Sequence, residues 1–113
     1  MSKKYKLIIL PEAQQDIRNI ILYIAIELAS PYTALSLQDS FEEAVNSLST
    51  MPHRYKIIDE EPWKRKGIRR FQVKSYFIYY LISESDNSVK IIAVIYVRRN
   101  QEEQLLLREE IDR

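Results

Sequence analysis

The chain has 113 residues, of which 46% are hydrophobic and 29% are charged, and its formal net charge is +1. This length and balance predict one folded domain, residues 1–113, and give no argument for nucleic-acid binding from bulk charge. The absence of cysteine excludes disulfides and thiolate metal sites, and the single glycine, Gly67, excludes a P-loop and a dinucleotide-binding fingerprint.

The first strand is predicted from residues 4–10, KYKLIIL, which change from alternating lysine and apolar residues to a continuous apolar run. This run is too short for a signal peptide or a membrane span, so we expect a cytoplasmic protein without membrane contact. Pro11 ends the strand and suits the first position of a helix, where its missing N–H costs nothing.

Two helices follow, because apolar residues recur at three- and four-residue spacing. The first is predicted from Pro11 to about Leu28, with the stripe Ile17, Ile20, Ile21, Ile24 and Leu28. Ser30 and Pro31 are typical of an N-cap and a first helical residue, and they begin the second helix. Its stripe is Leu37, Phe41, Ala44, Val45 and Leu48. The short connection predicts an antiparallel hairpin.

Residues 67–100 predict three consecutive strands, since aromatic and β-branched runs are divided at Lys74-Ser75 and at residues 83–88. With the first strand they predict an α+β fold, in which an antiparallel three-stranded meander completes a four-stranded sheet and the helices pack on one face. The loop at residues 53–66 is predicted to lie on the surface.

Side chains alternate between the two faces of each strand. In the second of the three strands, Phe77 and Tyr79 are therefore predicted to share one face. In the third, Ile92, Val94 and Tyr96 are predicted to share one face. Both faces of these strands are apolar, whereas a helical hairpin covers only one. We therefore expect an uncovered apolar face that a partner chain covers. Self-association through this face, or coverage by residues 101–113, are the alternatives.

Few residues offer enzymatic or metal chemistry. His53 is the only histidine, and its place beside Pro52 in a loop is typical of an ordinary exposed residue. The carboxylates of the helices are explained by the helix dipole and by solvation: Glu12, Asp16, Glu42 and Glu43. We expect no metal and no cofactor.

Basic residues mark the ends of the strand block. They are Arg69 and Arg70 where it begins, Lys74 at the first turn, and Arg98 and Arg99 where it ends. Guanidinium groups bind phosphates, and nearby tyrosines stack on bases, so these residues are candidates for target binding and leave a non-toxic nucleic-acid-binding module open. The structural alternative is that they only end strands or pair with loop carboxylates.

The order strand, helical hairpin, loop, GIRRFQVKSYFIYYLI and VKIIAVIYVRRN resembles the RelE/ParE superfamily of small toxins from bacterial type II toxin–antitoxin systems. The most specific parts are Gly67 to Phe71, the SYFIYY strand that ends at Tyr80, and the closing Arg98-Arg99. The resemblance implies a toxin of a plasmid stabilisation system that arrests growth, together with a cognate antitoxin whose amphipathic segment wraps the toxin. It also implies a homodimer or a toxin–antitoxin hetero-oligomer. The expected antitoxin contacts are Phe77, Tyr79, Ile92, Val94 and Tyr96.

The superfamily has a RelE-like branch that cleaves mRNA on the ribosome and a ParE-like branch that poisons DNA gyrase. RelE-like nucleases usually carry an arginine at the position of Phe77, a histidine at that of Tyr96 and a tyrosine near Leu105. If this chain were a nuclease, the candidate catalytic residues would be Arg69, Arg70, Tyr96 and Arg99. Phe77 lacks the cation that would neutralise charge at a scissile phosphate. The resemblance therefore favours the ParE-like, non-enzymatic branch, with the ribosome-dependent nuclease as the alternative.

Overall fold

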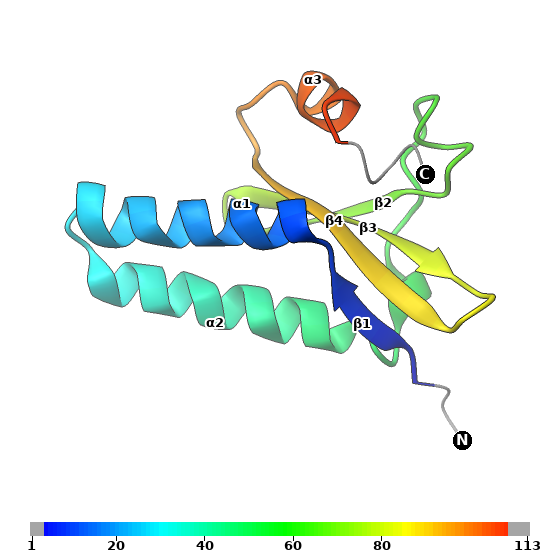
Figure 1. Cartoon of the computed structure of the whole chain (residues 1–113), viewed down its shortest axis with the longest axis horizontal. Coiled ribbons are helices and arrows are strands. Elements are labelled where there is room, and N and C mark those ends of the chain that lie inside the picture. Colours follow the sequence, from blue (N-terminus) through cyan, green and yellow to red (C-terminus); the bar gives the residue numbers. More distant parts are fainter. Residues whose placement is uncertain (1–3, 109–113) are drawn as a thin grey trace.

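The computed structural model describes residues 4–108, which form a four-stranded sheet and a helical hairpin (Figure 1). The strands are β1 (Lys6–Ile9), β2 (Arg69–Val73), β3 (Tyr76–Ser83) and β4 (Ser88–Tyr96), in the order β1-β4-β3-β2. β1 lies parallel to β4, whereas β4, β3 and β2 form the expected antiparallel meander. The α+β fold predicted from the sequence is confirmed.

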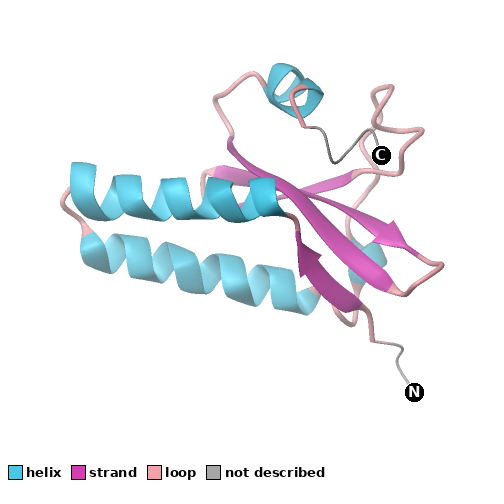
Figure 2. Cartoon of the chain, in the orientation of Figure 1, coloured by secondary structure: helices cyan, strands magenta, loops and turns pink. Residues whose placement is uncertain are grey.

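The hairpin consists of α1 (Pro11–Leu22) and α2 (Pro31–Ser47), each with proline in its first turn as predicted. Both helices lie on the same side of the sheet, and the end of the hairpin that joins them projects beyond the strands (Figure 2). Ser30 precedes α2, but its hydroxyl donates to Thr33 Oγ1 at 2.9 Å and does not cap a backbone N–H.

The helix that begins at Pro11 continues as a π-helical turn, η1 (Tyr23–Glu27). Leu28 N donates to Tyr23 O at 3.1 Å, a bond across five residues. The wider winding rotates the following residues away from the apolar stripe. Ile24 is therefore 8% exposed while Leu28, predicted to share its face, is 56% exposed. The predicted stripe is wrong at its last position.

A first hydrophobic core lies between the hairpin and the sheet. Phe41, Val45 and Leu48 of the α2 region meet Ile78, Tyr80 and Ile91 of the sheet there. The two apolar helix stripes predict these contacts, because burying each stripe against an apolar surface removes it from water. This core fixes the hairpin against β3 and β4.

The second face of the sheet is covered by the chain itself. Ile58, Trp63 and Ile68 of the loop before β2 pack there, and so does Leu105 of α3 (Gln101–Leu106). Beneath them lie the sheet residues Tyr79, Ile92, Ala93 and Ile95. The prediction of an uncovered apolar face is therefore wrong, because an aperiodic loop supplies the missing layer. The alternative of cover by residues 101–113 holds in part, since Leu105 packs there, and residues 109–113 lie outside the described part.

A β-bulge interrupts the predicted alternation in β4. Tyr79 is paired with Ala93 and Tyr80 with Ile91, so Ile92 is an extra residue in β4. One extra residue reverses the facing of every later side chain. Val94 therefore packs in the first core while Ile92 packs in the second. The prediction that Ile92 and Val94 share a face is wrong for this reason.

Tyr80 provides a measurable pH dependence. Its buried hydroxyl donates to Pro52 O at 2.7 Å, and burial raises its pKa from 10.0 to about 12, against a smaller lowering effect of Arg69. Folding favours the neutral phenol, so its stabilisation is complete below pH 10 and is lost as the pH rises through about 12.

We expect Tyr80→Phe to lower the free energy of unfolding by about 1 kcal/mol at neutral pH, because one buried hydrogen bond is lost. Urea denaturation at neutral pH and at alkaline pH measures both effects. The variant should lose less stability than the parent on going from pH 10 to pH 12. An equal loss in the two proteins would contradict the assignment.

Candidate functional site

A groove of about 1290 Å³ lies between the hairpin and one end of the sheet. Its lining comes from α1, η1, α2, β3, β4 and α3, and it includes Val94 and Ile95. The groove therefore combines segments that are far apart in sequence. We call it the tyrosine groove, after its four tyrosines, Tyr23, Tyr32, Tyr76 and Tyr96.

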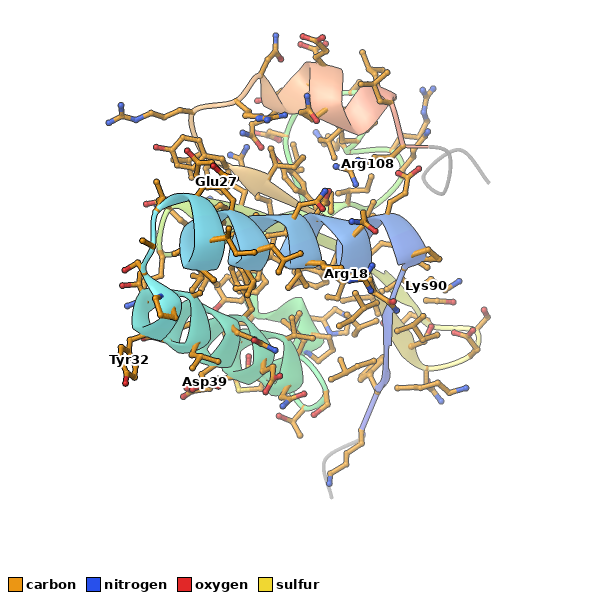
Figure 3. All side chains as sticks on the ribbon, turned by 60° about the vertical axis from the view of Figure 1, so that its left-hand side comes forward. Arg18, Glu27, Tyr32, Asp39, Lys90 and Arg108 are labelled. Carbon is orange, nitrogen blue, oxygen red and sulfur yellow. The ribbon has the colours of Figure 1, made fainter. Side chains whose placement is uncertain are left out.

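Two of the four tyrosines, Tyr23 and Tyr32, come from the hairpin, and the other two, Tyr76 and Tyr96, come from the sheet. Tyr76 and Tyr96 face one another across β3 and β4 with ring centroids 5.7 Å apart. Burial first, and then the neighbouring hydroxyls of Tyr96 and Tyr23, raise the pKa of Tyr76. Tyr32 projects from the hairpin away from the rest of the molecule (Figure 3).

Three cations lie at the same end of the sheet. Lys74 occupies the β2–β3 turn, and Arg98 and Arg99 follow β4. The two segments are joined by a bond from Val97 N to Ser75 O of 3.0 Å. All three side chains are exposed, and none forms an ion pair with a carboxylate within residues 4–108. Lys74 and Arg99 line the tyrosine groove.

Lys74 adopts φ of 55°, a left-handed conformation that is costly for a residue with a Cβ atom. We expect Lys74→Gly to be about 1 kcal/mol more stable than Lys74→Ala, because glycine adopts this conformation without strain. The midpoints of urea denaturation of the two variants measure the difference. Equal midpoints would show that the turn relaxes when the lysine side chain is removed.

The structure divides the predicted target-binding set. Arg69 and Arg70 lie at the far end of β2, about 13 to 17 Å of strand away from Lys74. Arg69 Nη1 donates to Tyr55 O at 2.6 Å, and Arg70 lies 4.2 Å above the Phe77 ring on the other face. Only Lys74, Arg98 and Arg99 come together.

The expected antitoxin contacts are also separated. Tyr79 and Ile92 are buried in the second core, and Val94 is buried in the first. Phe77 is half-buried beneath Arg70, and Tyr96, 40% exposed, lines the tyrosine groove. The assignment of these five residues to the antitoxin stays a prediction, and three of them are inaccessible in this conformation.

Exposed apolar side chains gather where α1 meets α2. We call this surface the hairpin tip, and its members are Leu22, Tyr23, Ile26, Leu28, Tyr32 and Leu35. The π-helical turn produces part of it by rotating Leu28 outward. Periodicity alone does not reveal this surface, since it assigns Leu28 to the core.

Asp16, predicted to serve only the helix dipole and solvation, is a structural residue in the lining of the groove. Its Oδ2 accepts from Val94 N at 2.9 Å and from Arg108 Nη1 at 2.9 Å. Its Oδ1 accepts from Arg108 Nη2 at 3.1 Å, which completes a bidentate pair. Arg108 Nε also lies 3.7 Å from Glu12. Figure 3 shows Arg108 beside α1, where this contact ties the C-terminal segment to the helix.

His53 is exposed, as predicted, and its Nε2 lies 2.9 Å from Glu84 Oε1. It does not line the tyrosine groove. Among residues 4–108, no three His, Asp or Glu side chains are grouped so that they could hold a metal ion. No helix in the same range is long and apolar enough to cross a membrane.

Comparisons with known proteins agree with this fold. Three solved structures are similar to it, each at no more than 20% identity: the chromosomal ParDE system of P. aeruginosa, the RelBE2 complex of Mycobacterium tuberculosis and the isolated E. coli RelE toxin. The P. aeruginosa structure has a TM-score of 0.68 at 18% identity and matches 86% of this chain and 100% of its own. The RelBE2 structure has a TM-score of 0.58 at 20% identity, with coverages of 82% and 91%.

The E. coli RelE structure has a TM-score of 0.50 at 14% identity, with coverages of 91% and 95%. A search of curated proteins gave no match. A protein-family model described as the ParE toxin of the type II toxin–antitoxin system parDE matches residues 7–101, most of the chain. The chain therefore belongs to the ParE toxin family of type II toxin–antitoxin systems.

Proposed function

We propose that this toxin arrests bacterial growth by inhibiting DNA gyrase and that a cognate antitoxin neutralises it, as part of a plasmid stabilisation system. The observation that carries the proposal is the match of residues 7–101 to the ParE family. The position of Phe77 agrees with it, because the ring and the stacked Arg70 occupy the place where the nuclease branch needs a free arginine.

The alternative is a ribosome-dependent mRNA nuclease. Tyr96 and Arg99 favour it, since both line the tyrosine groove. The other two candidate catalytic residues argue against it, because Arg69 is held by Tyr55 O and Arg70 lies on the opposite face. A phosphoryl-transfer site needs its cations around one phosphate. The ParE-like function is therefore the stronger proposal.

Controlled expression of the full chain in bacteria tests the function. Growth arrest with induction of the DNA-damage response, and inhibition of purified gyrase in a supercoiling assay, are the expected results. Arrest with codon-positioned mRNA cuts and normal supercoiling would support the nuclease instead. Normal growth at confirmed protein levels would contradict both.

For the antitoxin we propose an amphipathic segment whose apolar residues cover the hairpin tip and whose carboxylates pair with Lys74 and Arg99. Hydrophobic anchors in an exposed apolar surface supply most of the binding energy of such a helix or extended segment. The free toxin should therefore associate with itself, and the antitoxin should keep it dissolved.

Substitutions at the tip separate antitoxin binding from toxicity. Ile26→Asp with Leu35→Asp is expected to arrest growth like the parent but to escape rescue by the antitoxin encoded beside it, because buried unpaired carboxylates oppose docking. Leu106→Asp with Leu107→Asp is the matched control, because it also adds two carboxylates. Leu106 and Leu107 are 61% and 67% exposed, against 58% and 68% for Leu35 and Ile26. Full rescue of the tip variant would place the antitoxin elsewhere.

A further inference from the structure

The tyrosine groove is positively charged. The charged residues in its lining are Asp16, Lys74, Arg99 and Arg108. Asp16 and Arg108 form an ion pair and neutralise one another, so Lys74 and Arg99 leave two positive charges. The exposed Arg98, next to Arg99 in the chain, adds a third. Charge therefore gathers here although the whole chain carries only +1.

The lining of the same groove also contains exposed aromatic rings. Tyr96 is 40% exposed, Tyr23 is 56% exposed and Tyr32 is 86% exposed. Tyr76 also lines the groove and adds a neutral hydroxyl. Exposed rings next to unpaired cations are the two elements that bind unpaired bases and their phosphates.

We infer that the tyrosine groove binds single-stranded nucleic acid, with phosphates on Lys74, Arg98 and Arg99 and a base stacked on Tyr96. A duplex would use the cations but keep its bases stacked within the helix, away from the tyrosines. The site lies on the hairpin side of the sheet and is distinct from the face of Phe77 and Arg70. It goes beyond the proposed inhibition of gyrase and does not depend on it.

Fluorescence anisotropy with a short dye-labelled DNA strand of mixed sequence tests the inference on the purified full chain. The affinity is expected to fall steeply with salt, since each phosphate that a cation neutralises releases counterions. An RNA of the same sequence shows which kind of strand the groove prefers, and binding of either strand supports the inference. Tighter binding of the matched duplex than of either strand would overturn it.

Two triple variants, one at the site and one elsewhere, show whether the salt dependence of binding comes from the cations of the groove. The triple variant Lys74→Gln, Arg98→Gln, Arg99→Gln is expected to lower the slope of log affinity against log salt by about 2, as three lost contacts to a single strand predict. The control variant carries Lys6→Gln, Arg18→Gln and Lys56→Gln, three exposed cations that do not line the groove. Both variants change the net charge equally, so an equal loss in both would overturn the site.

Tyr96 distinguishes stacking from charge. Tyr96→Leu is expected to weaken binding about tenfold at constant salt slope, whereas Tyr96→Phe keeps a ring and binds within about twofold of the parent. Equal affinities of the leucine and phenylalanine variants would contradict the stacked base. Circular dichroism confirms that each variant is folded.

The binding assay and the growth assay fail independently. A chain that binds the strand but does not arrest growth would contradict the proposed toxin function and support this site. A chain that inhibits gyrase but binds no strand at low salt would support the proposed toxin function and contradict this site.

Discussion

Replacing Asp16 with alanine is expected to lower the free energy of unfolding by about 3 kcal/mol, because a largely buried guanidinium then loses its partner. Asp16 and Arg108 are 18% and 10% exposed at their side chains, and the same carboxylate accepts the N–H of Val94. That N–H lies on the edge of β4 beyond the last residue paired with β1. Urea denaturation followed by circular dichroism measures the loss.

Asp39→Ala is the matched control, since Asp39 is an exposed carboxylate on the outer surface of α2 (Figure 3). We expect it to change stability by less than about 0.5 kcal/mol. The double variant Asp16→Ala, Arg108→Ala should be no less stable than Asp16→Ala alone, because the two side chains share one interaction. A loss of less than about 0.5 kcal/mol for Asp16→Ala would show that the pair does not stabilise the fold.

The Asp16–Arg108 contact also shows a limit of prediction from sequence. Its partners are 92 residues apart, and each is an ordinary residue in its own segment. The helix dipole accounts for an acidic residue early in α1, so the local sequence does not predict an ion-pair partner for it. Only the helical spacing indicated that Asp16 is not simply exposed. Asp16 lies four residues before Ile20, and therefore on the side of α1 that turns toward the sheet.

The elements themselves were predictable because they follow from local periodicity. Pro11 and Pro31 mark the helix starts, and the apolar runs mark the strands. Two of the errors come from places where one residue changes the winding or the register. The π-helical turn moves Leu28 out of the core, and the bulge at Ile92 turns Val94 into the first core. Neither place carries a glycine or proline that would predict it.

The cover on the second face was missed because the loop before β2 has no period. Ile58, Trp63 and Ile68 are five residues apart among charged residues, so neither the helix nor the strand pattern finds them. Composition held a clue, since the only tryptophan of the chain lies in this loop and large aromatic residues bury much area. A loop that contains a tryptophan and several isoleucines is therefore expected to cover a sheet face, even without a regular period.

The cover on the second face also limits where a partner can bind. Covering the second face removes Tyr79 and Ile92 from the accessible surface, so apolar contacts are left chiefly to the hairpin tip. Tyr23 and Tyr32 belong both to that tip and to the tyrosine groove. An antitoxin on the tip would therefore also cover the proposed strand site. A bound antitoxin would then exclude nucleic acid from the tyrosine groove.

Trp63→Ala is expected to be the most damaging single substitution in the loop, with a loss of about 4 kcal/mol, because it leaves a large cavity against Tyr79 and Ile92. Trp63 is 3% exposed and packs in the second core with Ile68. Circular dichroism must follow the unfolding, since this residue is the only tryptophan. Exposed apolar surface should appear as increased binding of a hydrophobic dye.

Trp63→Phe refills most of the space and should recover at least half of the loss. Leu107→Ala, at an exposed position in the C-terminal segment, controls for the removal of apolar surface that already faces water. If Trp63→Ala were as stable as Leu107→Ala, the loop would not hold the second core together. The sheet face would then be open to a partner, and the sequence-based assignment of Tyr79 and Ile92 to the antitoxin would regain its physical basis.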